Sequence, residues 1–344
     1  MHIFVTGAAG FIGSHFIERA LAAGHRVTGL YRRERPALLG HLRRLGADLR
    51  CGDILNGDAV GAAAAGADAA CHFAGAFKES DAGRDYFERL NVKGTETVLT
   101  AAAQQGVKRF VFCSTAGIYG RNIDGVANEE SPLRPWNDYE NSKVAAEKLV
   151  RERAPALRIE YVILRPSVVY GPRDDRLAKL FRSASKGRFP LFGSGKGRRQ
   201  MVHVTDVADA FLRACERPEA ANTDMIIAGP DAMPLRDMLQ ILAHAADRRS
   251  AGPQLPLTPM LALAALVEDV CKPLKIKPPI YRRRMEFYRS DAAFDCSRAR
   301  RLLGWEAKIP LKDGLNRTME AYRRQMSAGT SRLAQRHETA SGLD

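Results

Sequence analysis

Long apolar runs are missing from this sequence of 344 residues. The longest candidate, "MLALAALV" at residues 260–267, is far shorter than the roughly 18 to 20 residues that span a bilayer. C-x-x-C pairs and histidine clusters are also missing around the six scattered cysteines, which are Cys51, Cys71, Cys113, Cys215, Cys271 and Cys296. We therefore expect reduced thiols, no metal site and no transmembrane segment. Because residues 1–10 already have the pattern of a strand entering a turn, we expect no signal peptide and a cytoplasmic protein.

Signatures of nucleic-acid binding are missing as well, although the chain is basic. Its 53 Lys and Arg against 39 Asp and Glu give a formal net charge of +14. Such an excess favours anionic partners, such as nucleotides, phosphorylated substrates, nucleic acid or a membrane surface. The sequence shows no basic face interleaved with aromatics and no helix-turn-helix pattern, so we expect no nucleic-acid partner. We attribute the charge to an anionic cofactor and substrate and to an arginine-rich surface.

What is present is an alternation of short β-rich runs with helical stretches. We expect strands at residues 2–7, 26–32, 48–53, 68–76, 108–115 and 158–166, with helices between most of them. This order predicts an α/β fold with a doubly wound parallel sheet covered on both faces. From residue 167 the pattern loosens, so we predict a first domain over 1–166, to which parts of the later chain could return. A smaller C-terminal lobe would cover 167–325 and a flexible tail 326–344.

A glycine-rich turn follows the first expected strand. The stretch "TGAAGFIGSH" contains Gly7, Gly10 and Gly13 and opens a helix. The first glycine permits a tight turn, the second lets the backbone approach a pyrophosphate, and the third lets helix and strand pack closely. The helix N-terminus then offers N–H groups to the phosphates. The first domain is therefore predicted to be a Rossmann-like domain that binds NAD(P), and the lobe would bind the substrate.

The end of the second strand bears on which dinucleotide is bound. An acidic residue there would bind the ribose 2′-hydroxyl of NAD. The sequence instead reads "GLYRRERP", with Arg32 and Arg33 at this position. Guanidinium groups suit a 2′-phosphate, so NADP is favoured over NAD. A solvated basic loop, or Glu34 acting as the acid, is the alternative.

Further segments resemble the extended short-chain dehydrogenase/reductase family, the NAD(P)-dependent epimerase/dehydratase group. The resemblance covers most of the chain, in order and in spacing from residue 1 to about 211, and again in the tail segment 294–315. The matching stretches after the glycine turn are "GDI" (52–54), "HFAGA" (72–76), "NVKGT" (91–95), "STAGIYG" (114–120), "YENSK" (139–143), "RPSVVYGP" (165–172) and "VHVTDVADA" (202–210).

The resemblance implies a catalytic triad. Tyr139 would transfer a proton, and Lys143 would bind the nicotinamide ribose and lower the pKa of the tyrosine. Residues four apart share one helix face, and a nearby ammonium favours a phenolate. Thr115 would hydrogen-bond the substrate oxygen, with Ser114 as the fallback, since adjacent strand residues point to opposite faces. The alternative for Thr115 is that its hydroxyl only caps a turn.

The resemblance also implies the cofactor contacts. Asp53 would accept from the adenine amine beside the Ile54 backbone, and Ala74 and Gly75 would line the nicotinamide ribose. The predicted cofactor-binding residues are Gly7, Gly10, Phe11, Ile12, Gly13, Arg32, Arg33, Asp53, Ile54, Ala74, Gly75, Ser114, Tyr139, Lys143 and Pro166. His72 is expected to be structural. By analogy alone we expect a homodimer, formed by the helices that contain residues 91–104 and 139–150.

The substrate is less narrowly indicated. The family's 4,6-dehydratases place an Asp–Glu pair after the catalytic threonine, whereas this chain has Ala116 and Gly117, which argues against dehydration. A nucleotide sugar is the first choice for hydride transfer. Arg199 occupies the position of the family's diphosphate-binding arginine, and Arg173 adds charge. Against this choice, Val168 replaces the asparagine typical of sugar enzymes.

Two alternatives stay open. The first is a 3β-hydroxysteroid or dihydroflavonol-type dehydrogenase that acts on a lipophilic alcohol or ketone. The apolar stretch at 257–271 would then provide an apolar wall, and the basic residues 272–284 would lie near a membrane surface. The second is a non-catalytic NADP-sensing regulator, which the presence of Tyr139, Lys143 and Thr115 disfavours.

Overall fold

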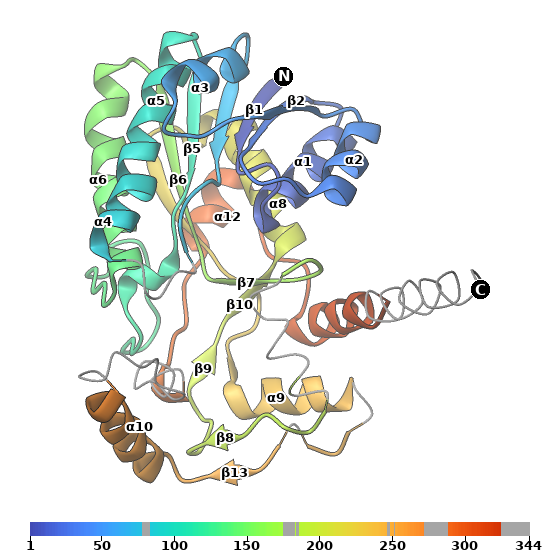
Figure 1. Cartoon of the computed structure of the whole chain (residues 1–344), viewed down its shortest axis with the longest axis vertical. Coiled ribbons are helices and arrows are strands. Elements are labelled where there is room, and N and C mark those ends of the chain that lie inside the picture. The colour runs from blue at the N-terminus through green and yellow to red at the C-terminus, as the bar shows by residue number, and fades with distance from the viewer. Residues whose placement is uncertain are drawn as a thin grey trace, which may run out of the picture. The chain divides into compact units, whose positions relative to one another are not determined.

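The chain forms two compact units in a computed structural model, which describes residues 1–77, 83–174, 183, 186–245, 248–250, 252–271 and 288–324 (Figure 1). The first unit comprises Met1–Val169, Gln200–Pro230 and Ala292–Lys308. The second comprises Tyr170–Arg199, Asp231–Asp291 and Ile309–Asp344. Two later segments thus return to the first unit. The predicted flexible tail, 326–344, lies outside the described residues.

A seven-stranded parallel sheet forms the centre of the first unit, which confirms the expected α/β, Rossmann-like fold. Its order is β11-β6-β5-β4-β1-β2-β3. The strands are β1 (His2–Thr6), β2 (Arg26–Tyr31), β3 (Asp48–Cys51), β4 (Ala69–His72), β5 (Arg109–Cys113), β6 (Glu160–Pro166) and β11 (Thr223–Ile227). The first six follow the order of a dinucleotide-binding sheet, and β11 adds a strand beside β6.

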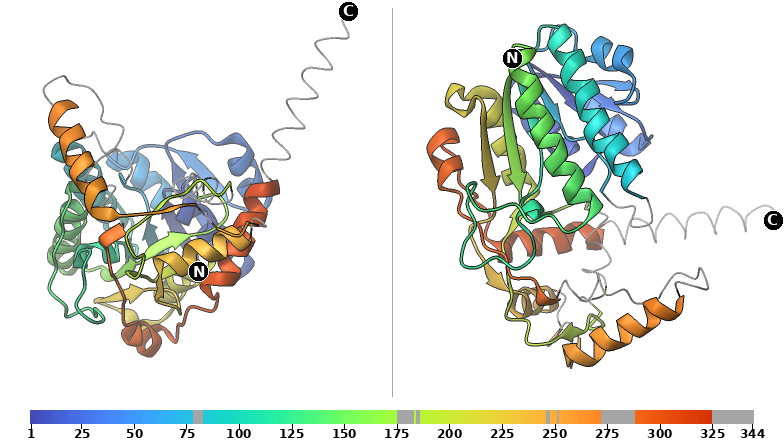
Figure 2. Two further views of the ribbon diagram at one scale, coloured as in Figure 1. Left: turned by 90° about the horizontal axis from the view of Figure 1, so that it is seen from below. Right: turned by 90° about the vertical axis from the view of Figure 1, so that its left-hand side faces the viewer.

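Helices cover both faces of this sheet (Figures 1 and 2). Successive strand residues point to opposite faces, so Ile3 and Val5 pack on one side and Phe4 on the other. The first side is covered by α1 (Phe11–Ala22), α2 (Pro36–Arg44), α8 (Val204–Glu216) and α12 (Ser297–Leu303). The second is covered by α3 (Gly57–Ala64), α5 (Gly94–Gln104) and α6 (Asp138–Ala156).

Shorter elements connect these layers. A turn of helix, α4 (Arg84–Phe87), runs into a π-helical segment, η1 (Glu88–Lys93), and then into α5. Short 3₁₀ helices in the described part of the chain are η2 (Ala116–Tyr119), which begins shortly after β5, and η3 (Pro218–Ala220). Two short strands, β7 (Val168–Tyr170) and β10 (Met201–His203), flank the segment that belongs to the second unit.

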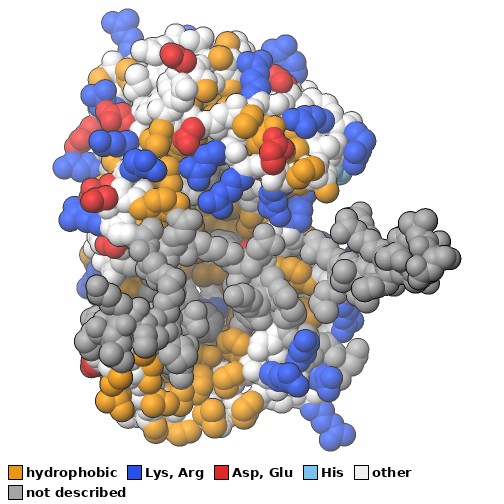
Figure 3. Space-filling model, in the orientation of Figure 1, with side chains coloured by type: hydrophobic (Ala, Val, Ile, Leu, Met, Phe, Trp, Pro, Cys, Tyr) orange, Lys and Arg blue, Asp and Glu red, His pale blue; other side chains and the backbone are white. Residues whose placement is uncertain are grey.

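Among its described residues, the second unit contains short strands and several helices. β8 (Leu191–Phe192) pairs with β13 (Gln254–Leu255), and β9 (Arg198–Arg199) pairs with β12 (Met233–Pro234). The helices are α9 (Leu235–His244), α10 (Leu257–Cys271) and residues 311–324. Hydrophobic side chains gather on the surface in the lower part of Figure 3, where Figure 1 places α10. Within the described part of the chain, no helix is long and apolar enough to cross a membrane.

Candidate active site

The carboxyl ends of the parallel strands position the predicted triad. Thr115 lies two residues after the end of β5 and is the N-cap of η2, while Tyr139 and Lys143 lie in the first turns of α6. Asn137 begins α6 by accepting a hydrogen bond from the Glu140 N–H at 2.9 Å. Lys143 Nζ donates to the carbonyl oxygen of Cys113, the last residue of β5, at 2.7 Å. The helix start and the strand end are therefore joined through the lysine of the triad.

Lys143 is held in a buried environment. Its side chain is buried, and Nζ lies 4.6 Å from the centroid of the Phe112 ring. Burial lowers the pKa of the Lys143 ammonium, while Cys113 and Glu147 act in the opposite direction. Glu147 lies one helical turn further along α6. The site therefore contains an ammonium group that is fixed in position and little exposed to solvent.

Tyr139 lies among aromatic side chains. Its ring meets Phe77 edge to face, with 4.9 Å between centroids, and Phe87 at 6.3 Å. It also packs against the cluster of Ala76, Phe87 and Leu90. Phe77 itself is 49% exposed. The proposed proton-transfer residue thus has a fixed ring and an exposed apolar neighbour.

Thr115 forms the contact that the alternative interpretation predicted. Its Oγ1 accepts a hydrogen bond from the Gly117 N–H at 3.1 Å, so it caps the turn into η2. Because this hydrogen bond is a capping contact, the catalytic role of Thr115 stays a prediction. Ser114 is buried, and its Oγ lacks a hydrogen-bond partner among the described residues. It lies beside Glu147, near enough to help lower the pKa of that carboxyl group but outside hydrogen-bonding geometry.

Glu140 is a site residue that the sequence did not reveal. A side-chain carbon at Gly117 would lie 3.1 Å from Glu140 Oε1 and 3.3 Å from Thr115 Oγ1. The carboxyl group therefore fills the space above the glycine. Its Oε2 accepts from the Trp136 N–H at 3.1 Å. Burial raises the pKa of Glu140, although hydrogen bonds from Trp136 and Asn137 oppose that shift.

The glycine-rich turn fits a dinucleotide. Gly7 has φ +71°, and a Cβ there would lie 2.9 Å from the Ala74 N, so only glycine allows this close approach to the chain after β4. A Cβ on Gly13 would lie 2.3 Å from the Gly7 oxygen. The turn, Ala74 and Gly75 are thereby brought together, as the predicted cofactor contacts require.

Asn91, in the stretch "NVKGT", lies between the chain after β4 and α6. Its Oδ1 accepts from the Ala76 N–H at 2.7 Å, and its Nδ2 donates to the Ser142 Oγ at 2.8 Å. It thus connects the chain after β4 to α6. A Cβ on Gly75 would lie 2.8 Å from Asn91 Oδ1 and 3.9 Å from Lys143 Nζ. Asn91 therefore holds the chain at residues 75–76 in place beside Lys143.

His72 is structural, as its geometry indicates. Its ring nitrogens contact Thr6 Oγ1 at 2.7 Å and Thr95 Oγ1 at 3.1 Å, and it stacks against Phe112. Burial, with a contribution from the charge of Lys143, lowers the pKa of His72 to about 3. The imidazole is therefore neutral at neutral pH and ties β4 to its neighbours.

The arginines after β2 include one that the sequence did not single out. Arg35 Nη1 donates to the Ala9 oxygen within the glycine-rich turn at 3.3 Å. Arg32 pairs with Asp53 at 3.5 Å, and Arg33 is exposed. Glu34, the alternative acid, accepts a hydrogen bond from the Tyr31 hydroxyl at 3.0 Å. The turn that would hold the cofactor phosphates is therefore contacted by a guanidinium group.

Arg199 and Arg173, the predicted substrate-binding residues, lie in the second unit, whereas the other candidates lie in the first. Arg199 is buried, and its Nη1 donates to the Arg198 oxygen at 2.8 Å and to the Ser290 oxygen. Burial lowers the pKa of Arg199 to about 10, against an opposing effect of Asp291. Arg198 pairs with Asp291 at 2.8 Å. Arg173 adopts a left-handed conformation with φ +72°.

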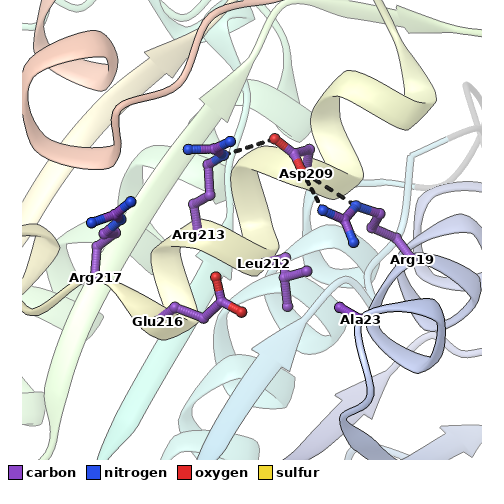
Figure 4. Close-up of a pocket in the computed structure, with 7 residues that line it drawn as sticks. All are labelled: Arg19, Ala23, Asp209, Leu212, Arg213, Glu216 and Arg217. Carbon is purple, nitrogen blue, oxygen red and sulfur yellow. Dashed lines mark hydrogen bonds and ion pairs between the residues drawn. The ribbon is translucent and has the colours of Figure 1, made fainter.

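A charged surface pocket of about 180 Å³ lies away from the triad, between α1 and α8 (Figure 4). Asp209 bonds both Arg19 and Arg213 at 2.8 Å across it. These ion pairs lower the pKa of Asp209, although its partial burial opposes them. None of the predicted site residues lines this pocket. We infer that these ion pairs stabilise the packing of α1 against α8.

A parallel sheet of this order, with a glycine-rich turn after β1, defines a dinucleotide-binding protein of the Rossmann type. Residues 3–228 match the NAD dependent epimerase/dehydratase family, and the chain belongs to that family. It is accordingly an NAD(P)-dependent enzyme of the oxidoreductase type.

Known relatives cover nearly the whole chain. It is 28% identical to 4-hydroxy-2-methyl-3-oxo-4-farnesyl-3,4-dihydroquinoline-1-oxide ketoreductase of Stigmatella aurantiaca, over 93% of this chain and 96% of that protein. It is 29% identical to UDP-glucose 4-epimerase of Mycolicibacterium smegmatis, over 94% and 99%. The structure of MoeE5 in complex with UDP-glucose and NAD is similar, with 25% identity and a TM-score of 0.74, covering 95% and 100%.

Proposed function

We propose that the chain transfers hydride between NADP and a substrate carbon that bears oxygen, with Thr115, Tyr139 and Lys143 as its catalytic groups. The observation that carries this proposal is the bond from Lys143 Nζ to the Cys113 oxygen, which holds the ammonium at the carboxyl end of β5. The nicotinamide, when bound, supplies the hydride acceptor or donor. The close approach of Gly7 to the Ala74 backbone supports binding of the dinucleotide at the glycine-rich turn.

Each residue of the predicted triad would have a separate role in the reaction. In the oxidation of an alcohol, Tyr139 as phenolate would take the proton of the substrate hydroxyl group; in the reduction of a ketone, the Tyr139 hydroxyl would return a proton to the substrate oxygen. Lys143 favours the phenolate through its charge. Thr115 would orient the substrate oxygen. Arg32, Arg33 and Arg35 would hold the 2′-phosphate, with Asp53 at the adenine.

For the substrate, a nucleotide sugar is our first candidate. The basic stretch at residues 196–199 and the relative named a UDP-glucose 4-epimerase support it. Arg199 and Arg173 would bind the diphosphate. We do not propose 4,6-dehydration, because Ala116 and Gly117 carry no acid. The homodimer and the cytoplasmic location stay predictions.

A lipophilic alcohol or ketone is the second candidate, and one specific observation favours it. Phe77 and Val168 are 49% and 53% exposed, and they follow the carboxyl ends of β4 and β6, the strands on either side of β5. Exposed apolar side chains at that edge suit an apolar substrate. The relative named a ketoreductase of a farnesyl compound agrees with this candidate.

A thermal-shift panel in the presence of NADP separates the two candidates. We expect UDP-, GDP- or dTDP-sugars to raise the melting temperature, because a ligand that binds only the folded state stabilises it. Stabilisation by sterols or farnesylated ketones, with no effect of any nucleotide sugar, would favour the second candidate. Stoichiometric consumption of NADPH identifies a reductase, whereas an epimerase shows no net cofactor turnover. Binding without any turnover would favour the NADP-sensing regulator.

The three arginines after β2, which are Arg32, Arg33 and Arg35, predict a preference for NADP over NAD. Arg35→Ala is expected to raise the Kd for NADP about 10- to 100-fold and to change the Kd for NAD little, since a charge-assisted contact with the 2′-phosphate is lost. Arg32→Ala should have a smaller effect in the same direction, because Arg32 also pairs with Asp53. Calorimetric titration with both cofactors measures this. Arg26→Ala, at the opposite end of β2, is the matched control. Tighter binding of NAD than of NADP by the unmodified protein would contradict the assignment.

A further inference from the structure

The helix α10 is apolar on two opposite faces, and only one of them is covered. On the inner face, Ala264 is fully buried and packs with Phe192, while Leu257, Met260 and Leu261 are partly buried in the same cluster. On the outer face, Leu263, Leu266 and Val270 are 44%, 62% and 54% exposed. Their spacing of three and four residues places them on one side of the helix. An amphipathic helix packed only against its own domain would carry polar residues there.

Positive charges in the same unit as α10 favour an anionic surface as the occupant of its outer face. Arg289 follows Tyr288, whose ring packs in the inner cluster, and Arg188 precedes Phe189, whose ring lies 6.2 Å from that of Tyr288. Both arginines are exposed. In the amino-acid sequence, residues 272–284 come after α10, and they contain six Lys and Arg and no Asp or Glu. The acidic residues of α10 itself are Glu268 and Asp269, near the end of the helix, so positive charge exceeds negative charge in this part of the sequence.

The size of the face argues against a second copy of the chain. At 1.5 Å per residue, a helix of this length is about 22 Å long and about 10 Å wide, so one side offers roughly 200 Å². A stable protein interface buries about 800 Å² on each partner. An interfacial helix, in contrast, needs only one apolar side and flanking positive charge to rest on a bilayer that contains anionic lipid.

We propose that the outer face of α10, with Leu263, Leu266 and Val270, docks the protein on the surface of a membrane that contains anionic lipid. The apolar side chains enter the boundary between headgroups and acyl chains, and exposed cations of the same unit, such as Arg188 and Arg289, bind the headgroups. This docking is peripheral, since α10 lies along the surface and does not cross the bilayer. It is independent of which substrate is bound.

Vesicle co-sedimentation of the full chain tests the proposal. We expect binding to vesicles of phosphatidylcholine mixed with phosphatidylglycerol, weaker binding to phosphatidylcholine alone, and loss of binding in high salt. The double variant Leu263→Gln and Leu266→Gln should reduce the partition coefficient at least about tenfold, because its apolar insertion is removed. Leu266→Gln alone should give an intermediate loss.

Matched controls change exposed apolar residues elsewhere. Leu45→Gln and Val126→Gln alter side chains that are 46% and 56% exposed in the first unit, and both should bind vesicles as the unmodified chain does. NADP affinity and near-ultraviolet circular dichroism should be unchanged in every variant. Absence of binding to the anionic vesicles, or equal binding by the double variant, would overturn the proposal. So would light scattering that shows a dimer dissociating only in the double variant, since the face would then join two copies.

Discussion

Tyr139→Phe is expected to lower kcat by about 10²- to 10⁴-fold while NADP still binds with nearly the same affinity. The substitution removes only the hydroxyl group, which is the group proposed to exchange a proton with the substrate oxygen. The ring keeps its edge-to-face contact with Phe77 and its packing against Phe87. Turnover measured with the compound that the ligand panel identifies, alongside calorimetric titration with NADP, tests this expectation.

Tyr86→Phe is the matched control, because Tyr86 packs against the same apolar cluster as Tyr139 but lies in α4. It should retain turnover within about twofold, because the substitution removes a hydroxyl group that has no part in the proposed proton transfer. Lys143→Met should reduce both turnover and cofactor affinity, since its ammonium is proposed to contact the ribose. Turnover by Tyr139→Phe at the unmodified rate would eliminate the proposed mechanism, whatever the substrate.

Glu147→Gln is expected to lower the free energy of unfolding by about 3 kcal/mol. The Glu147 carboxylate is fully buried and bonds Arg165 at 3.0 and 2.8 Å; the Arg165 side chain is only 3% exposed. Breaking a buried ion pair typically costs about 3–5 kcal/mol, because one charge is left without its partner. We expect the lower end of this range, since Arg165 also pairs with Asp224 at 2.6 Å. Urea unfolding at neutral pH measures the difference.

The matched control for this variant lies on the same helix. Glu152 pairs with Lys148 at 3.8 Å, but both side chains are mostly exposed, so Glu152→Gln should change stability by less than about 0.5 kcal/mol. If the two variants lost equal stability, burial of the pair would not be the source of the effect.

The same pair predicts a dependence on pH. Burial alone would raise the pKa of Glu147, but the hydrogen bonds and charge of Arg165 outweigh it and hold the pKa below its usual value. The stabilisation is therefore present above the pKa of an unfolded glutamate, about 4.3, and is lost as the pH falls through the lower folded value. The difference between the unmodified chain and Glu147→Gln should shrink in acid. A difference that stays constant would contradict this linkage.

Local patterns account for what the sequence could predict. The alternation of strands with helices and the glycine turn are short-range signals. The fold, and the position of Tyr139 and Lys143 on one helix, could therefore be predicted from the sequence. Contacts formed by tertiary packing were not. Arg35 reaches the glycine turn, and Asn91 joins the chain after β4 to α6, only because the sheet brings distant segments together. No sequence pattern marks Glu140 as the carboxyl group that fills the space above Gly117.

The return of β11 to the sheet constrains how the chain can fold during synthesis. Until residues 223–227 leave the ribosome, β6 has an open edge whose N–H and C=O groups can pair with another chain. A fragment that stops at residue 166 would retain the glycine turn and the predicted triad yet keep that edge exposed, and we expect it to aggregate. Trp305 lies further along still, and its indole N–H donates to the Asp206 oxygen at 3.0 Å within the first unit. Fragments designed for expression should therefore continue beyond α12.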